Sequence, residues 1–277
     1  NFFQKFFIPA PVIGGLIISL INLILNQIGF GFFIFDEVIQ DFFMNIFFTC
    51  IGLACSFKVL KKSGWLGIKL AFAIILLLPL QNLLAVALTY IFGINPLLGV
   101  AMGSTSMTGG IGSAVSFGKI MEGYGAINST SIGVAAATFG ILIGSLVGGP
   151  VASRLISRNN LKSVGSKNLN EDSKKIRPIS QKTLMDAIIV IGLASFLGTF
   201  INRILTMTSL NFPYYVGCQF GGLIIRNIYD LVKKDSHIDN IEILGNISLN
   251  LFLSLALINL NISAILGLAL PCLLYTS

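Results

Sequence analysis

The chain has 277 residues, of which 55% are hydrophobic and only 10% are charged, and its net charge is +7. A soluble domain carries about a quarter charged residues, so this chain has too little charge to cover a water-facing surface of its size. Disorder is excluded as well, because it requires low hydrophobicity together with high net charge. The composition predicts an all-α polytopic membrane protein.

Both ends of the sequence predict a fragment. The chain begins at Asn1, with neither a methionine start nor the pattern of a signal peptide. It stops inside an apolar run, residues 266–274, which Tyr275, Thr276 and Ser277 follow. We therefore expect sequence to be missing on both sides.

Apolar runs that can form transmembrane helices follow one another along the chain. A helix needs about 20 apolar residues to cross the hydrocarbon core. The first half offers residues 8–28, 42–57, 65–92, 97–118 and 127–153, with Lys69 as their only charged residue. The second half offers residues 184–205, 212–225, 243–260 and 262–274. We expect the shorter runs to be tilted, partly covered or interrupted helices.

The positive charge lies mostly in one stretch. Residues 153–182 hold eight basic and two acidic residues, which accounts for six of the seven net positive charges. Because cytoplasmic loops carry an excess of Lys and Arg, we expect a basic cytoplasmic linker at residues 153–183. Three lysines at 58–62 mark a second cytoplasmic loop by the same rule. A nucleic-acid-binding face would spread its charge over a folded surface, so no nucleic acid partner is expected.

Both basic loops are expected on the cytoplasmic side, but three apolar runs separate them, residues 65–92, 97–118 and 127–153. One of these runs must therefore enter and leave the membrane on the same side. Residues 97–118 are the candidate, because Gly109, Gly110 and Gly112 fall in the middle of the run and glycine is a poor helix former. Non-helical backbone at membrane depth is tolerated only where protein or a watery cavity satisfies it. The sequence therefore predicts a re-entrant hairpin or a broken helix here.

Hydroxyl groups and glycines gather in this run. A broken helix exposes N–H groups, which favour a carboxylate, and carbonyl groups, which with hydroxyl oxygens suit a desolvated Na⁺. The candidate substrate-binding residues are Ser104, Ser106, Thr108, Gly109, Gly110, Gly112 and Ser113. The candidate sodium-binding residues are Thr105, Met107 and Thr108. The alternative is that these small residues only let helices pack closely.

Other polar and small residues carry weaker expectations. Lys119 and Glu122 can pair with each other, or Lys119 can attract an anionic substrate, or both can be solvated charges at the membrane interface. Gly140, Gly144 and Gly148 have the GxxxG spacing of a close helix–helix seam. No nucleophile elbow, P-loop or zinc motif is present, so we expect no enzyme, no cofactor and no metal other than transported Na⁺.

Four blocks together resemble the bacterial sodium/glutamate symporter family. Residues 8–16 are similar to its IPEPVxGGL opening, and residues 103–113 are similar to its glycine-rich hairpin GSxxxxGGHGT. Residues 137–152 resemble its ATFG…GGPVA helix, and residues 244–253 resemble its LGNxSLxLFL segment. One departure is Ile111, which stands where the family pattern has a histidine.

The resemblance implies an inverted-repeat transporter with a glycine-rich re-entrant hairpin in each half. Residues 1–152 would be the first half without its first helix, with residues 97–118 as its hairpin. Residues 184–277 would begin the second half, whose hairpin is missing from this sequence. The family likeness also implies a homodimer and an elevator-like displacement of the substrate.

The same resemblance implies Na⁺-coupled uptake of L-glutamate by a multi-pass protein of the bacterial inner (cytoplasmic) membrane. The partners would then be L-glutamate, Na⁺ as the coupling ion, and the lipid bilayer. Two alternatives stay open. One is a related transporter of another carboxylate or dicarboxylate anion, and the other is a structural or channel-like membrane protein that does not transport actively.

Overall fold

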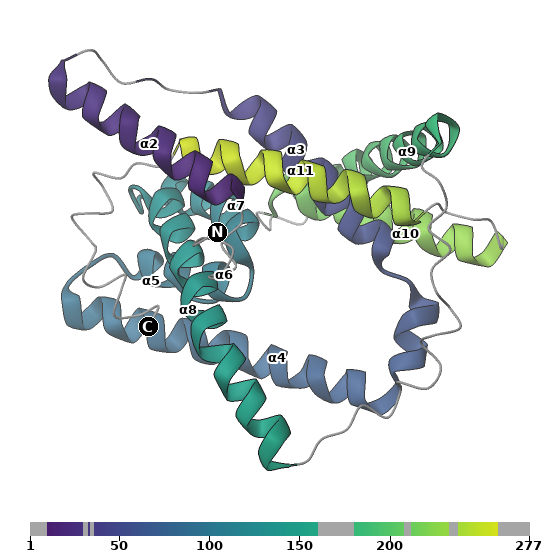
Figure 1. Cartoon of the computed structure of the whole chain (residues 1–277), viewed down its shortest axis with the longest axis horizontal. Coiled ribbons are helices and arrows are strands. Elements are labelled where there is room, and N and C mark those ends of the chain that lie inside the picture. The colour runs from purple at the N-terminus through teal and green to yellow at the C-terminus, as the bar shows by residue number, and fades with distance from the viewer. Residues whose placement is uncertain are drawn as a thin grey trace.

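The structure is a computed structural model that describes residues 10–29, 33, 36–159, 180–207, 212–232 and 238–259. These residues form helices and no strand (Figure 1). In chain order the helices are α2 (Ala10–Ile28), α3 (Glu37–Ala54), α4 (Phe57–Phe92), α5 (Pro96–Met102), α6 (Ser104–Met107), α7 (Gly110–Gly123), α8 (Ser129–Arg158), α9 (Gln181–Thr206), α10 (Tyr214–Val232) and α11 (Ile238–Ile258).

Four described helices are long and apolar enough to cross a membrane. They are α3, the Gly64–Phe92 part of α4, α9, and α11 from Asp239 onward. The all-helical fold predicted from composition is therefore confirmed for the described residues, and these four helices are consistent with a polytopic membrane protein. The predicted run at residues 262–274 and most of the basic linker lie outside the described residues.

Helix α4 has a bend near its start. Gly64 takes φ 56° and ψ −149°, which lies outside the helical region and is open to glycine because it has no side chain. The bend separates the exposed lysines Lys58 and Lys61 from the apolar part of the helix. The first turn is tied to α10, since the Ser56 hydroxyl donates to Asp230 at 2.5 Å and the Phe57 N–H donates to Asn227 at 2.9 Å.

The helices pack as two groups. Helices α2, α3, α9, α10 and α11 pack against one another, and so do α4 to α8 (Figure 1). Glycines allow the close approaches inside the first group. A side chain at Gly52 would overlap the main chain of Gln219, and one at Gly222 would overlap the carbonyl oxygen of Thr49. Small residues thus let α3 and α10 touch backbone to backbone.

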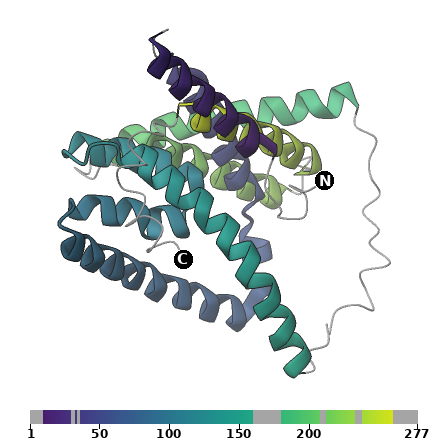
Figure 2. The ribbon, with the colours of Figure 1, turned by 60° about the vertical axis from the view of Figure 1, so that its left-hand side comes forward.

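Helix α7 is the main bridge between the two groups. Its residues Ile111, Ala114 and Val115 share one buried cluster with Phe48 of α3 and Phe252 of α11, among others. Most of α4 lies away from the first group, along the lower edge of the molecule in Figures 1 and 2. The face of α7 toward α3 and α11 is therefore the surface on which the two groups meet.

Candidate functional site

The helix predicted over residues 97–118 is interrupted, as the glycines indicated. Helix α5 ends at Gly103, which takes φ −72° and ψ −133°, and the four residues of α6 follow. Helix α7 begins at Gly110, whose φ of 73° is the left-handed region that favours glycine. A side chain at Gly110 would meet no atom of the described residues within 4 Å, so among these residues nothing blocks the main chain on this side.

The interrupted segment returns toward its starting point. Leu98 near its beginning and Met121 near its end belong to one buried cluster, together with Ile132 and Ala136 of α8. Helices α5 and α7 therefore lie beside each other, and α8 packs against both.

Ser106 and Ser104, two of the predicted substrate-binding residues, are held by neighbouring groups. The Ser106 side chain is 2% exposed, and its hydroxyl faces the carbonyl oxygens of Ala101 and, at 2.7 Å, Gly133. Its contacts tie the break to α8. The main-chain N–H of Ser104 donates to Oδ1 of Asn82 at 3.0 Å, which ties the start of α6 to α4.

Ser113 and Gly112 face the first helix group. The hydroxyl of Ser113 lies 3.4 Å from that of Tyr215 in α10. The Tyr215 ring stacks on Phe48 with 3.9 Å between centroids, and a side chain at Gly112 would come within 3.0 Å of the Phe48 ring. Gly112 therefore lets α7 press against this aromatic pair.

The remaining predicted site residues divide into packed and exposed positions. Met107 packs on Gly140 of α8, with its sulfur 2.9 Å from where a side chain at Gly140 would begin. Thr105 is half-buried, whereas Thr108 and Gly109 are exposed. The Thr108 hydroxyl donates to Oε1 of Gln81 at 2.7 Å. The open side of the break thus consists of Thr108, Gly109 and Gly110.

This arrangement is suited to binding an anion and a cation rather than to covalent chemistry. No side chain caps the start of α7 in the described structure, so no side chain competes with a ligand for its first N–H groups. Thr108 offers a hydroxyl oxygen beside them. The N–H of Gly109, just before the helix, donates to the carbonyl oxygen of Ser104 at 3.0 Å. Over the described residues, no group of three or more His, Cys, Asp and Glu side chains is placed to hold a metal ion.

Three residues at the site were missed from the sequence. Gln81 and Asn82 carry a signal that is visible there, since they are adjacent amides in an otherwise apolar run. In a membrane such side chains are expected to face protein. Tyr215 carries no such signal, because its contact with Ser113 is made across the fold.

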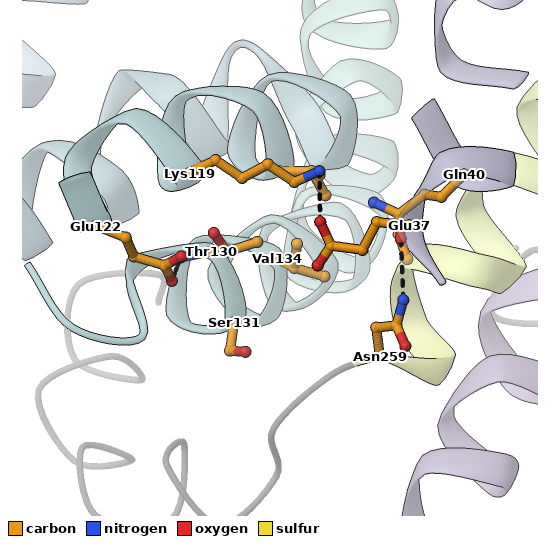
Figure 3. A pocket seen from close by; sticks show the side chains of 10 residues that line it. Glu37, Gln40, Lys119, Glu122, Thr130, Ser131, Val134 and Asn259 are labelled. Atoms are coloured by element: carbon orange, nitrogen blue, oxygen red, sulfur yellow. Dashed lines mark hydrogen bonds and ion pairs between the residues drawn. The ribbon is translucent and has the colours of Figure 1, made fainter. Parts of the chain in front are cut away.

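A second polar site lies beside α7, in a pocket of about 210 Å³ between α3, α7, α8 and α11 (Figure 3). Lys119 forms ion pairs with Glu37 at 2.7 Å and Asp41 at 3.0 Å. The pair of Lys119 with Glu122 considered above is not formed, because Glu122 instead accepts from the N–H of Thr130 at 3.0 Å. Lys119 thus connects the two helix groups and also lines this pocket.

Comparison with known proteins agrees with these features. A family model for the sodium/glutamate symporter matches residues 1–276. The sodium/glutamate symporter of Haemophilus influenzae is 32% identical over 286 residues, covering 99% of this chain and 70% of that protein. The proteins of that name from Escherichia coli K12 and Shigella flexneri are each 31% identical with the same coverage. No solved structure matches the chain.

Proposed function

This chain belongs to the sodium/glutamate symporter family, and we propose that it takes up L-glutamate together with Na⁺ across the bacterial cytoplasmic membrane. The observation that carries the proposal is the interrupted helix between α5 and α7, whose open main chain at Gly110 lies inside an apolar helical protein. Transport of this kind makes and breaks no covalent bond, so the family is not a class of enzymes.

The start of α7 is proposed to bind a substrate carboxylate. The N–H groups at Gly110 and Gly112 would be the donors, because helix N-termini favour anions. The N–H of Gly109, also predicted as a donor, is engaged by the carbonyl oxygen of Ser104 at 3.0 Å. Ser113, near the same end, would add its hydroxyl. Ile111 does not stand between them and the substrate, since its side chain is 4% exposed and packs in the core. The absence of the family histidine therefore leaves a main-chain carboxylate site possible.

The oxygen atoms of residues 105–108 are proposed to bind Na⁺. Discontinuous helices of secondary transporters use unwound carbonyl groups for cations and helix N-termini for anionic groups. Coupling would follow because each bound ion offsets the charge and the desolvation of the other. Neither glutamate nor Na⁺ alone would then stabilise the conformation that carries the substrate across the membrane.

A re-entrant hairpin at residues 97–118 is part of the proposal. It is supported by the return of α7 beside α5. It is also supported by the basic loops at 58–62 and 153–182: if both are cytoplasmic, the chain must cross the membrane an even number of times between them. We also propose two inverted halves, residues 1–152 and the region from 184 onward, and a homodimer. These rest on the family likeness.

Uptake by the purified full-length protein in proteoliposomes tests the proposal. An inward Na⁺ gradient should drive accumulation of labelled L-glutamate above equilibrium, and dissipating the gradient should abolish it. Competition with aspartate, malate and citrate tests the alternative of another carboxylate anion. Flux that stays passive whichever way the gradient is imposed would instead indicate a channel-like protein.

A further inference from the structure

Two adjacent amides of α4 contact the two ends of the short helix α6. Within the Gly64–Phe92 span, Gln81 and Asn82 are the only amide side chains, and both are half-buried. Asn82 accepts the N–H of Ser104, which begins α6, and Gln81 accepts the hydroxyl of Thr108, the cap residue that follows its last residue. The most apolar of the four spans therefore places its polar groups on the break.

The contact with Gln81 determines what Thr108 can bind. A threonine hydroxyl has one proton to donate and two lone pairs to accept with. At 2.7 Å from Oε1 of Gln81, the hydroxyl has its proton engaged. The Thr108 oxygen can then only accept, so it suits a cation and not a carboxylate.

The contact with Asn82 also makes this segment less suited to an anion. The N–H of Ser104 is engaged by Oδ1 of Asn82 and is not available to an anion. Gly103, just before it, has no room for a side chain, which would come within 2.7 Å of the same oxygen. The Thr108 end of α6 thus differs from the start of α7, where no side chain occupies the donors.

We propose that Gln81 is a positioning residue for the coupling ion: it holds the Thr108 hydroxyl so that its oxygen faces Na⁺. The inference rests on the proposed Na⁺ coupling and assigns Thr108 to the cation rather than to the substrate. Asn82 supports the same geometry by fixing the start of α6. Oxygen ligands of this kind are those that hard cations prefer.

The experiment measures two constants in proteoliposomes: the Na⁺ concentration for half-maximal uptake at saturating glutamate, and the KM for glutamate at saturating Na⁺. The variants are Gln81→Leu, Gln81→Glu, Thr108→Val and the double variant Gln81→Leu/Thr108→Val. Thr89→Val is the matched control, because its buried hydroxyl bonds only to Val86 within α4 in the described contacts. Thermal stability in detergent is followed for each variant.

Gln81→Leu and Thr108→Val should each raise the half-maximal Na⁺ concentration about tenfold, the equivalent of one hydrogen bond, with the KM for glutamate within about threefold. The double variant should be no worse than either single one, because Gln81 acts through Thr108. Gln81→Glu should keep near-native Na⁺ dependence, since a carboxylate accepts the same proton. Thr89→Val should change neither constant.

Several results would overturn the assignment. If Thr108→Val raised the KM for glutamate but left the Na⁺ dependence unchanged, Thr108 would be a ligand of the substrate and not of Na⁺. Additive effects in the double variant, or loss of function in Gln81→Glu, would show that Gln81 does not act by accepting from Thr108. Wild-type protein with no Na⁺-driven uptake would contradict the proposed function itself, a result that is distinct from these.

Discussion

The ammonium group of Lys119 lies 2.7 Å from the carboxylate of Glu37 and thereby joins α7 to α3. Asp41, one turn further along α3, shares the same ammonium at 3.0 Å. One lysine therefore balances two acids at the boundary between the helix groups. The lysine side chain is 32% exposed and that of Glu37 is 56% exposed, so water and salt screen this contact.

Removing Lys119 should have a small, salt-dependent effect. Lys119→Met leaves Glu37 and Asp41 facing each other, and we expect a loss of about 1 kcal/mol or less in unfolding free energy. The loss should shrink at high salt. Thermal unfolding in detergent at two salt concentrations measures it, with the exposed Lys182→Met as control. An effect that does not change with salt would contradict an electrostatic contact.

Gly112→Ala should destabilise the contact of α7 with the aromatic pair. The added carbon would lie 3.0 Å from two ring atoms of Phe48, whose ring is fixed by stacking on Tyr215. Overpacking of this kind costs about 1–3 kcal/mol. Gly123→Ala is the matched control in the same helix, since its added carbon meets no atom within 4 Å in the part of the chain that the structure describes. Equal stability of the two variants, measured by thermal unfolding, would contradict the tight contact.

Gly110→Ala tests the main-chain conformation at the start of α7, whereas Gly112→Ala tests steric overlap. The site is open, but its φ of 73° is strained for any L-residue with a side chain, by about 1–2 kcal/mol. We expect lower stability and a strongly reduced rate of uptake, because the start of α7 would change its conformation. Membrane insertion, checked by the yield of monodisperse protein, should be retained. Full uptake activity would show that this conformation is not needed.

Ser106→Ala should affect stability more than substrate binding. The hydroxyl is buried and faces the carbonyl oxygens of Ala101 and Gly133. The Gly133 carbonyl lies inside α8 and keeps its helical partner, so removing the hydroxyl mainly leaves the Ala101 carbonyl without this donor, at a cost of about 1–3 kcal/mol. The KM for glutamate should stay within about threefold in the protein that folds. A large rise in KM with native thermal stability would return Ser106 to the substrate site.

Acid should weaken the attachment of α4 to α10. The hydrogen bond from Ser56 lowers the pKa of Asp230, and the charges of Arg226 and Lys58 add to this against the opposing effect of burial. A carboxylate with a lowered pKa stabilises the fold above its unfolded pKa of about 3.9 and loses this contribution as pH falls through the folded value. Unfolding curves should show this loss below about pH 4 in the wild type, but less of it in Asp230→Asn.

The sequence predicted those parts of the fold that follow from local chemistry. Apolar length located the long helices, and the glycines at 109–112 located the interruption. The GxxxG spacing was less informative: Gly140 is packed on Met107, but a side chain at Gly144 or Gly148 would meet no described atom within 4 Å. The spacing permits a close seam, whereas the neighbouring helix decides whether one forms.

The partners of site residues were harder to predict. A pair with Glu122, three residues along the helix, was one of three alternatives for Lys119, yet its partners lie in α3, 78 residues or more away. Which acid a lysine meets depends on how α7 is turned against α3, and that is set by the buried cluster around Phe48 and Val115. A single sequence contains no direct record of that rotation.

The bend at Gly64 has a mechanical consequence. Before Gly64 in the chain, Ser56 and Phe57 are hydrogen-bonded to α10. After it, Gln81 and Asn82 of α4 are hydrogen-bonded to the interrupted segment. Rotation about the main chain of Gly64 would move the Gly64–Phe92 part of α4 together with the interrupted segment, while the first turn of α4 stays attached to α10. The first turns of α4, attached to α10, and the long apolar part of α4 are thus separated by one non-helical residue, Gly64.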